Sequence, residues 1–240
     1  MEIFGLSDKG LKRSNNEDSF YINKSNRFAI VADGMGGHQG GEVASFMCTS
    51  VMSSILEKQL KTKKENEEIK LLLQTALINV NKEIYERSMS DNNLHGMGST
   101  FSFFLNNKDS GLYLNIGDSR IYLIRNQQIT QLTKDDSIVA ELYDRGEITK
   151  SEYSSHPLRH IITKAVGIAE DLTVTVHQSD ILNQDYIVLC SDGLHEMIND
   201  EEILFHVKKN KTVRKICKRL VQTANDYGGN DNITVIAIKY

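Results

Sequence analysis

Proline, cysteine and long apolar runs are scarce in this chain of 240 residues, and each scarcity limits what the protein can be. The single proline, Pro157, and the absence of any Gly/Ser-rich stretch leave no obvious linker, so we expect one domain over residues 1–240. The three cysteines, Cys48, Cys190 and Cys217, are odd in number and widely spaced, with no C-x-x-C pair. Reduced thiols in a cytosolic protein are the simplest interpretation.

No segment approaches 18 consecutive apolar residues, and the first residues, MEIFGLSDKG, lack the basic and apolar regions of an export signal. We therefore expect a cytoplasmic protein without a membrane anchor. The chain carries 28 basic and 32 acidic residues, a net charge of −4. This balance predicts no general attraction to nucleic acid or to an anionic membrane, so local cations would have to draw in an anionic substrate.

Apolar residues recur with helical spacing in three segments, 41–60, 67–89 and 212–226, which predicts amphipathic helices. Runs rich in β-branched and aromatic residues predict strands, and many are separated by only a few residues, which favours antiparallel pairing. These runs are RFAIVAD, STFSFFLN, GLYLNIG, RIYLIRN, QITQLT, LTVTVHQ, DYIVLCS and NITVIAIKY. Strands grouped with strands indicate an α+β protein whose sheets are flanked by helix layers. The polar segment 134–170 fits a functional flap or a surface insertion.

Four aspartates stand where an apolar strand runs out: Asp33, Asp118, Asp192 and Asp231. Four carboxylates gathered at one end of a core would repel one another by several kcal/mol unless a cation neutralised them. Ligand sets made of oxygen alone suit Mg²⁺ or Mn²⁺ better than zinc. Each aspartate alone also fits an ordinary turn, but their joint occurrence predicts a metalloenzyme.

The segment VADGMGGHQGG at 31–41 is the densest local signal, because glycines let the backbone approach a ligand closely. A tight strand-to-helix turn is the alternative; neither nucleotide-binding glycine fingerprint is present.

The segment RSNNED at 13–18 places Arg13, which can bind phosphate bidentately, ahead of Glu17 and Asp18, which can hold metal-bound water. His38 is either a general acid or a surface residue at a helix start, and His160 in the flap segment is expected at the surface. The motifs of cysteine phosphatases, G-x-S-x-G hydrolases and H-E-x-x-H metalloproteases are absent.

These segments resemble a bacterial member of the metal-dependent protein phosphatases of type 2C, the PPM family. The matching segments follow the family order along nearly the whole chain. They are RSNNED, VADGMGGHQGGEVAS, GMGST, NIGDSRIYLIR, QLTKDDS, HPLRHIITKAVG, VLCSDGL and DNITVI. The resemblance implies a four-layer α-β-β-α sandwich, with two antiparallel sheets flanked by helices and a metal site at one edge. It also implies hydrolysis of phosphoserine and phosphothreonine in proteins.

The resemblance assigns a role to each candidate site residue. Asp33 would bridge two core ions, Mn²⁺ or Mg²⁺, and Gly34 would offer its carbonyl to one of them. Asp192 and Asp231 would bind the second ion. The other assignments are Glu17 and Asp18 as supports acting through water, Asp118 with Asp192 as ligands of an optional third ion, and Arg13 as the phosphate-binding arginine.

Two departures from the family pattern concern catalysis. Met35 stands where many eukaryotic members have the proposed general-acid histidine, and His38, three residues later, fits the bacterial variant of the motif. The flap segment reads KDDS, so Asp136 stands where a histidine is common. We expect the first departure to bear on the proton donor and the second on substrate handling.

The favoured mechanism is direct attack on phosphorus by a water that bridges two cations roughly 3.5–4 Å apart. Arg13 would orient the phosphate, and His38 or a metal-bound water would protonate the leaving oxygen. A non-catalytic phosphoprotein-binding module and a two-metal nuclease or phosphodiesterase are the alternatives. We expect phosphorylated proteins as substrates, a Ser/Thr kinase as counterpart, no nucleic-acid or membrane partner, and a monomer.

Overall fold

The computed structural model describes residues 1–25, 27–37, 39–62 and 64–240, which form two antiparallel sheets. In the first sheet the strand order is β1 (Glu2–Asp8), β11 (Ile233–Lys239), β10 (Tyr186–Cys190), β7 (Arg120–Arg125) and β8 (Gln128–Gln131). In the second it is β2 (Asp18–Asn23), β3 (Phe28–Met35), β5 (Phe101–Asn107), β6 (Ser110–Ile116) and β9 (His177–Asp180), and the short β4 (Gly98–Ser99) pairs with β3. Every printed strand pair is antiparallel, as expected from the short connections.

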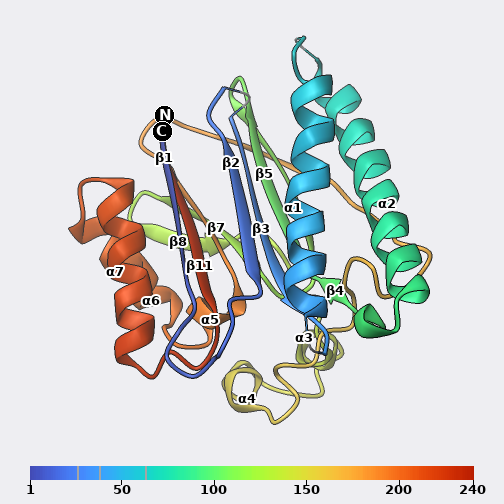
Figure 1. The fold of residues 1–240 in the computed structure, drawn as a ribbon. Helices are drawn as coiled ribbons and strands as arrows, with labels where there is room; N and C mark the ends of the chain where they lie inside the picture. The colour runs from blue at the N-terminus through green and yellow to red at the C-terminus, as the bar shows by residue number, and fades with distance from the viewer. Residues whose placement is uncertain (26, 38, 63) are drawn as a thin grey trace.

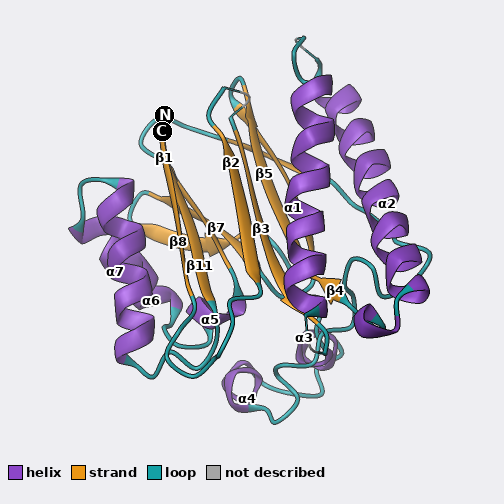
Figure 2. Ribbon diagram, viewed as in Figure 1, coloured by secondary structure: helices purple, strands orange, loops and turns teal. Residues whose placement is uncertain are grey.

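Helices cover the outer face of each sheet (Figures 1 and 2). Helices α1 (Gly40–Gln59) and α2 (Asn66–Ser90) pack on the second sheet, and α6 (Asp200–Lys209) and α7 (Val213–Asp226) pack on the first. The predicted four-layer α-β-β-α sandwich is therefore confirmed. Among the described residues, no helix has both the length and the apolarity that a membrane span requires.

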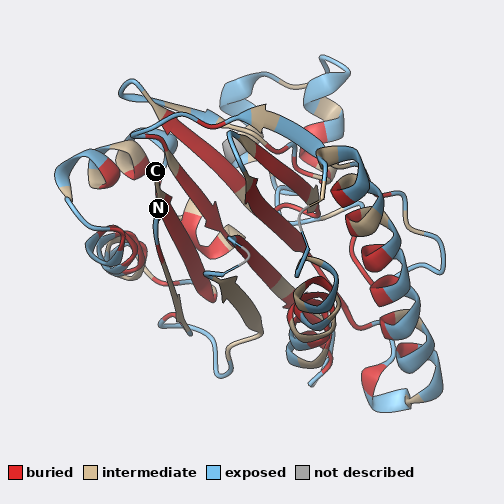
Figure 3. Ribbon diagram, turned by 90° about the horizontal axis from the view of Figure 1, so that it is seen from above, coloured by how far each residue is buried: buried red, intermediate tan, exposed pale blue. Residues whose placement is uncertain are grey.

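Three apolar clusters separate the four layers, and strand periodicity determines which residue joins which cluster. Along β3, Phe28 and Ile30 join the cluster under α1 and α2, while Ala29 and Val31 join the cluster between the sheets. Side chains alternate between the two faces of a strand, so a continuous apolar run is what a strand buried on both faces requires. The view from above shows the buried strands between helices that are exposed only on their outer sides (Figure 3).

Most predicted elements are present with nearly the expected bounds, and the differences have physical causes. Strands β1 and β2 were not predicted, because their residues are mostly half-buried and their apolar pattern is weak. Helix α6 was also missed. The prediction of a strand at LTVTVHQ is wrong for most of its length, since only its last two residues enter β9. Val174 instead packs under α2, and its carbonyl accepts a hydrogen bond from Gln74 Nε2 at 3.1 Å.

The predicted flap segment contains α3 (Ile138–Asp144) and α4 (Lys150–Ser155) and lies at the end of the strands opposite the two chain termini (Figure 1). A buried polar cluster connects it to the first sheet. Arg120 Nη2 donates to Asp135 Oδ2 at 2.6 Å, and Tyr153 Oη on α4 donates to the same oxygen at 2.9 Å. The flap is thus anchored beside the strand ends at which the site residues lie.

Candidate metal centre

The four strand-end aspartates meet at one edge of the sandwich, in a cleft of about 560 Å³. Asp33 lies near the end of β3, Asp118 between β6 and β7, Asp192 at the start of the short helix α5 (Asp192–His195), and Asp231 just before β11. Because these elements belong to both sheets, the stacking of the sheets brings the four side chains together. Arg13, Glu17 and Gly34 line the same cleft.

Close backbone packing positions Asp33 and Gly34. The Asp33 amide donates to Thr100 Oγ1 at 2.9 Å, and the Gly34 amide donates to the Glu17 carbonyl at 3.1 Å. A Cβ on Gly34 would lie 2.0 Å from the carbonyl oxygen of Gly41, at the start of α1, so no other residue fits there. The glycine turn thus brings α1 against the end of β3 and leaves the Asp33 side chain in the cleft.

A second close approach sets Asp192 against Asp231. A Cβ on Gly193 would lie 2.0 Å from the carbonyl oxygen of Asn232, which requires glycine after Asp192. The Asn232 side chain then binds the 9–17 loop at three points. Its Oδ1 accepts from the Glu17 amide, and its Nδ2 donates to the carbonyls of Lys9 and Asn15, each at 2.8 Å. The 9–17 loop is in this way held against the start of β11.

The carboxyl groups at and beside this cleft have pKa values above the ordinary range. Burial, followed by the charges of its neighbours Asp18, Asp192 and Asp118, raises the pKa of Asp33 well above its usual value. Burial and the nearby acids also raise the pKa of Asp118, bring that of Asp192 to about 6 and bring that of Asp18 to about 7. Without a counter-charge these groups disfavour one another's ionisation.

The donor set fits hard divalent cations. Among the described residues, Oδ1 of Asp18 and Oδ1 of Asp192 are buried side-chain oxygens with no hydrogen-bond partner, and such atoms are costly unless a cation or water satisfies them. Within the same described residues, no three acidic, histidine or cysteine side chains are arranged to hold a metal ion by themselves. An ion here would therefore complete its shell with water and backbone carbonyls, which is typical of Mg²⁺ and related ions.

Glu17 and Asp18 occupy different environments. Glu17 lines the cleft, and burial, opposed by Arg13, raises its pKa. Asp18 pairs with Asp33 in the β2–β3 register and lies behind it, where its Oδ2 accepts from Ser191 Oγ at 2.7 Å. Both positions agree with supporting roles around an ion. The candidate acid His38 lies outside the described residues.

Asp118 is anchored from two sides. Burial and the Arg120 charge lower the pKa of His195 to about 3, so the imidazole is neutral, and its Nε2–H donates to the Asp118 carbonyl at 3.0 Å. On the flap side, Asp136 Oδ2 accepts from the Gly117 amide at 3.1 Å, while its Oδ1 pairs with Lys164 at 3.0 Å. Asp136, the residue that replaces a common family histidine, thus holds the turn that carries Asp118.

Arginine and histidine side chains line the cleft as well. Arg13 Nη2 donates to Asp231 Oδ2 at 2.6 Å, with about half of the Arg13 side chain exposed. Arg159 and His160 reach the cleft from the flap, and His160 Nδ1 lies 2.7 Å from Glu196 Oε1. The site therefore combines a deep anionic floor with groups at its side that can attract phosphate.

Four residues that line this cleft were given no role in the site from the sequence: Arg159, His160, Glu196 and Asn232. His160 is exposed, as predicted, but at the edge of the cleft. The sequence does point to Glu196, which follows Asp192 by four residues at the end of α5. That spacing places two side chains on the same side of a helical turn. Burial and then Asp192 raise the pKa of Glu196 to about 7. No local pattern marks Arg159 and His160, since only the path of the flap brings them to the strand ends.

Comparisons with known proteins agree with this geometry. Residues 11–235 match the protein phosphatase 2C family. The serine/threonine phosphatase stp of Listeria monocytogenes is 38% identical over 236 residues, which cover 97% of this chain and 93% of that protein. Protein phosphatase PhpP of Streptococcus pneumoniae is 37% identical over 242 residues, with 99% and 97% covered.

Solved structures show the same architecture. The Mycobacterium tuberculosis serine/threonine phosphatase PstP/Ppp superposes with a TM-score of 0.90 at 35% identity, covering 100% of this chain and 99% of that one. The catalytic domain of PstP in complex with two manganese ions gives a TM-score of 0.87 at 33% identity, with 98% and 96% covered. The family match over nearly the whole length, on this fold, shows that the chain belongs to the protein phosphatase 2C family.

Proposed function

We propose that this protein is a metal-dependent protein serine/threonine phosphatase. The observation that carries the proposal is the cleft in which four strand-end aspartates meet beside Arg13. The named relatives are serine/threonine phosphatases, and the solved PstP complex holds two manganese ions. A phosphoprotein is therefore the substrate class that best fits this chain.

Two core ions, Mn²⁺ or Mg²⁺, would be held by Asp33, the Gly34 carbonyl, Asp192 and Asp231. Asp118 with Asp192 would hold a third, weaker ion. When bound, the ions neutralise the carboxylates and activate water for direct attack on phosphorus. This assignment accounts for the unpartnered Oδ1 of Asp192, found among the described residues, and for its closeness to Asp33.

Arg13 is placed to hold the phosphate. Its contact with Asp231 uses one N–H, and the remaining donors of the half-exposed guanidinium can bind phosphate oxygens at the side of the carboxylate floor. The same contact keeps the guanidinium directed at the candidate metal centre. His38 remains the candidate proton donor to the leaving seryl or threonyl oxygen.

A covalent thiol intermediate does not fit this chain. Burial raises the pKa of Cys48 and of Cys217 to about 12, and burial also raises that of Cys190. All three thiols are buried, so none offers a thiolate to a phosphoprotein. Direct hydrolysis by water is the mechanism consistent with this chemistry.

The test is hydrolysis of p-nitrophenyl phosphate and of a phosphothreonine peptide with Mn²⁺. Asp33→Asn and Asp231→Asn should each abolish turnover, while Asp171→Asn, at an exposed position outside the cleft, should keep it. Full activity of the wild type in EDTA would refute the proposal. Cleavage of nucleic acid but not of phosphopeptide would favour the nuclease alternative, and ion binding without turnover of any phosphopeptide would favour the binding module.

The partners are proposed on the same basis. We infer a Ser/Thr protein kinase as the counterpart that supplies the phosphorylated substrates, and a monomeric enzyme acting in the cytoplasm. A phosphoproteome comparison with and without the enzyme would identify the substrates. Sites that gain phosphate when the enzyme is removed should be serines and threonines.

A further inference from the structure

The densest positive charge on the chain lies where α6 ends and α7 begins. A quarter of the 28 lysines and arginines fall within residues 208–219, although the whole chain is acidic overall. No acidic residue occurs between Glu202 and Asp226. We call this surface the basic face; its seven members, all exposed, are Lys208, Lys209, Lys211, Arg214, Lys215, Lys218 and Arg219.

Neither helix electrostatics nor ion pairing within the described residues explains this arrangement. Arg214 and Lys215 lie in the first turn of α7, which has no acidic residue, and cations at a helix N-terminus oppose the helix dipole. The spacing of four between Arg214 and Lys218, and between Lys215 and Arg219, also places like charges side by side. In the part of the chain that the structure describes, none of the seven forms an ion pair with a carboxylate.

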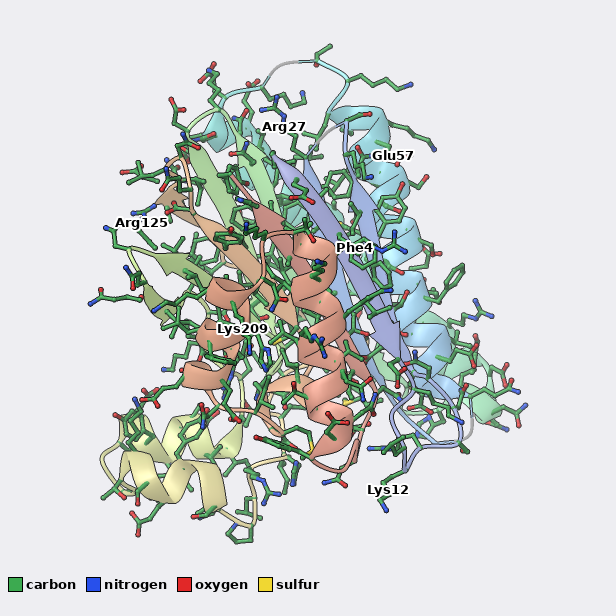
Figure 4. The ribbon with its side chains drawn as sticks, turned by 90° about the vertical axis from the view of Figure 1, so that its left-hand side faces the viewer. Phe4, Lys12, Arg27, Glu57, Arg125 and Lys209 are labelled. Atoms are coloured by element: carbon green, nitrogen blue, oxygen red, sulfur yellow. The ribbon has the colours of Figure 1, made fainter. Side chains whose placement is uncertain are left out.

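All four cations of α7 are exposed, and Arg214 also lies over the ring of Phe4 on β1, 5.6 Å from its centre. The opposite side of the helix is buried on the first sheet through Val213, Ile216, Cys217, Leu220, Val221 and Ala224. At 1.5 Å per residue, the 14-residue helix presents a strip of about 21 Å. Figure 4 looks onto this side of the molecule, where α7 runs down the middle beside the labelled Lys209.

An exposed aromatic ring adjoins the basic face. Phe205 on α6 is 54% exposed, and Lys209 Nζ lies 5.0 Å from the centre of its ring. A lysine has an apolar stem and a charged head, so it can lie at the headgroup level of a bilayer. An exposed phenylalanine beside it can enter the boundary between headgroups and acyl chains. The apolar side of α7 is already buried in the protein, so any bilayer contact of this helix is peripheral.

We propose that the basic face docks on the surface of a bilayer that contains anionic phospholipids. Clusters of four to eight Lys and Arg residues on an amphipathic helix are typical of such binding. Five of the seven cations are lysines, whose compact charge suits a layer of headgroups, whereas specific recognition of one phosphate group or nucleic-acid site favours the arginine fork. The expectation of no membrane attraction rested on net charge, which averages over the whole chain.

Docking of this kind leaves the cleft open. The residues that line the cleft lie at the ends of the strands beside the flap. Helix α7 runs along the outer side of the first sheet (Figures 1 and 4). Proteins at the bilayer surface could then reach the cleft from the side. This consequence rests on the proposed phosphatase function, whereas the docking itself does not.

The test is flotation of the full chain with vesicles of phosphatidylcholine alone, or with one third phosphatidylglycerol. We expect binding only to the anionic vesicles, and its loss at about 1 M salt, where the screening length is about 3 Å. The variant Lys215→Gln/Lys218→Gln/Arg219→Gln should bind on the order of a hundredfold more weakly, about fivefold for each charge. Its control, Lys24→Gln/Lys58→Gln/Lys61→Gln, removes the same charge from exposed positions outside the basic face and should bind as the wild type does.

Three results would overturn the proposal: no preference for anionic vesicles, equal losses in the two triple variants, or binding that persists at high salt. Binding of duplex DNA or of an acidic peptide through the basic face, without vesicle binding, would reassign the surface to that partner.

Circular dichroism and p-nitrophenyl phosphate hydrolysis should be unchanged in the variant Lys215→Gln/Lys218→Gln/Arg219→Gln. If it fails to fold, Lys218→Gln alone should lower binding about fivefold. Absence of phosphatase activity would not alter the vesicle result.

Discussion

Replacing Asp192 by Asn should stabilise the metal-free protein while abolishing Mn²⁺-dependent turnover. Asp192 is half-buried among acids with its Oδ1 fully buried, and this burial, followed by the charge of Asp231, raises the pKa of its carboxyl group from 3.8 to about 6. Above that pH, the folded protein must hold an ionised carboxylate that the unfolded chain would leave in water. An amide of the same shape removes this cost together with the ability to bind the ion.

The expected magnitude follows from the two pKa values. At about 1.4 kcal/mol per pKa unit, the ionised carboxylate lowers the free energy of unfolding by about 3 kcal/mol at pH 8. For a chain of this size that corresponds to a melting temperature higher by about 6–12 °C in the variant. Because the folded pKa of this acid is raised, its cost is present above about pH 6 and disappears as the pH falls towards 3.8.

Urea unfolding followed by circular dichroism in EDTA measures the difference directly, with equal m-values as the check on two-state behaviour. The advantage of Asp192→Asn should shrink between pH 8 and pH 4. Saturating Mn²⁺ should reverse the order, because an ion at a thousand times its Kd adds about 4.1 kcal/mol to the wild type alone, more than the advantage of about 3 kcal/mol. Asp171→Asn, at an exposed position, should change stability by less than about 0.5 kcal/mol. A variant that is less stable than the wild type in EDTA at pH 8 would refute the reasoning.

Three further predictions concern the metal centre and its supports. Asp118→Asn should leave two tightly bound ions, counted by calorimetry, and lower turnover; loss of both core ions would contradict its assignment to a third site. Burial raises the Asp135 pKa but the Arg120 charge and hydrogen bonds lower it further, so the net shift is downwards. Its stabilisation is then present above the usual carboxyl pKa and lost as the pH falls through the folded value. Asp135→Asn should thus lower the free energy of unfolding by about 3–5 kcal/mol at pH 7. The difference in free energy of unfolding between variant and wild type should shrink in acid, and urea titrations measure it. Gly34→Ala should fold poorly, because its Cβ would lie 2.0 Å from the Gly41 carbonyl oxygen; wild-type expression and melting would argue against that contact.

Local sequence patterns were enough to predict the layers of the fold and to propose most of the candidate site residues. Helix and strand periodicities are local, so α1, α2, α7 and the buried strands could be predicted from their own residues. The strand-end positions of Asp33, Asp118, Asp192 and Asp231 were visible in the same way. The chemistry of carboxylates beside an arginine then pointed to divalent cations and phosphate.

How these residues act on one another depends on the packing of the whole fold. The raised pKa values of Asp33 and Asp192 arise from burial and from neighbours distant in the chain, which no local pattern encodes. The flap path brings Arg159 to the cleft, and Asn232 holds the 9–17 loop through contacts more than 200 residues away in sequence. The outward side of α7 likewise became defined only once its apolar side was packed. Periodicity specifies an element, whereas burial and charge proximity depend on which elements meet.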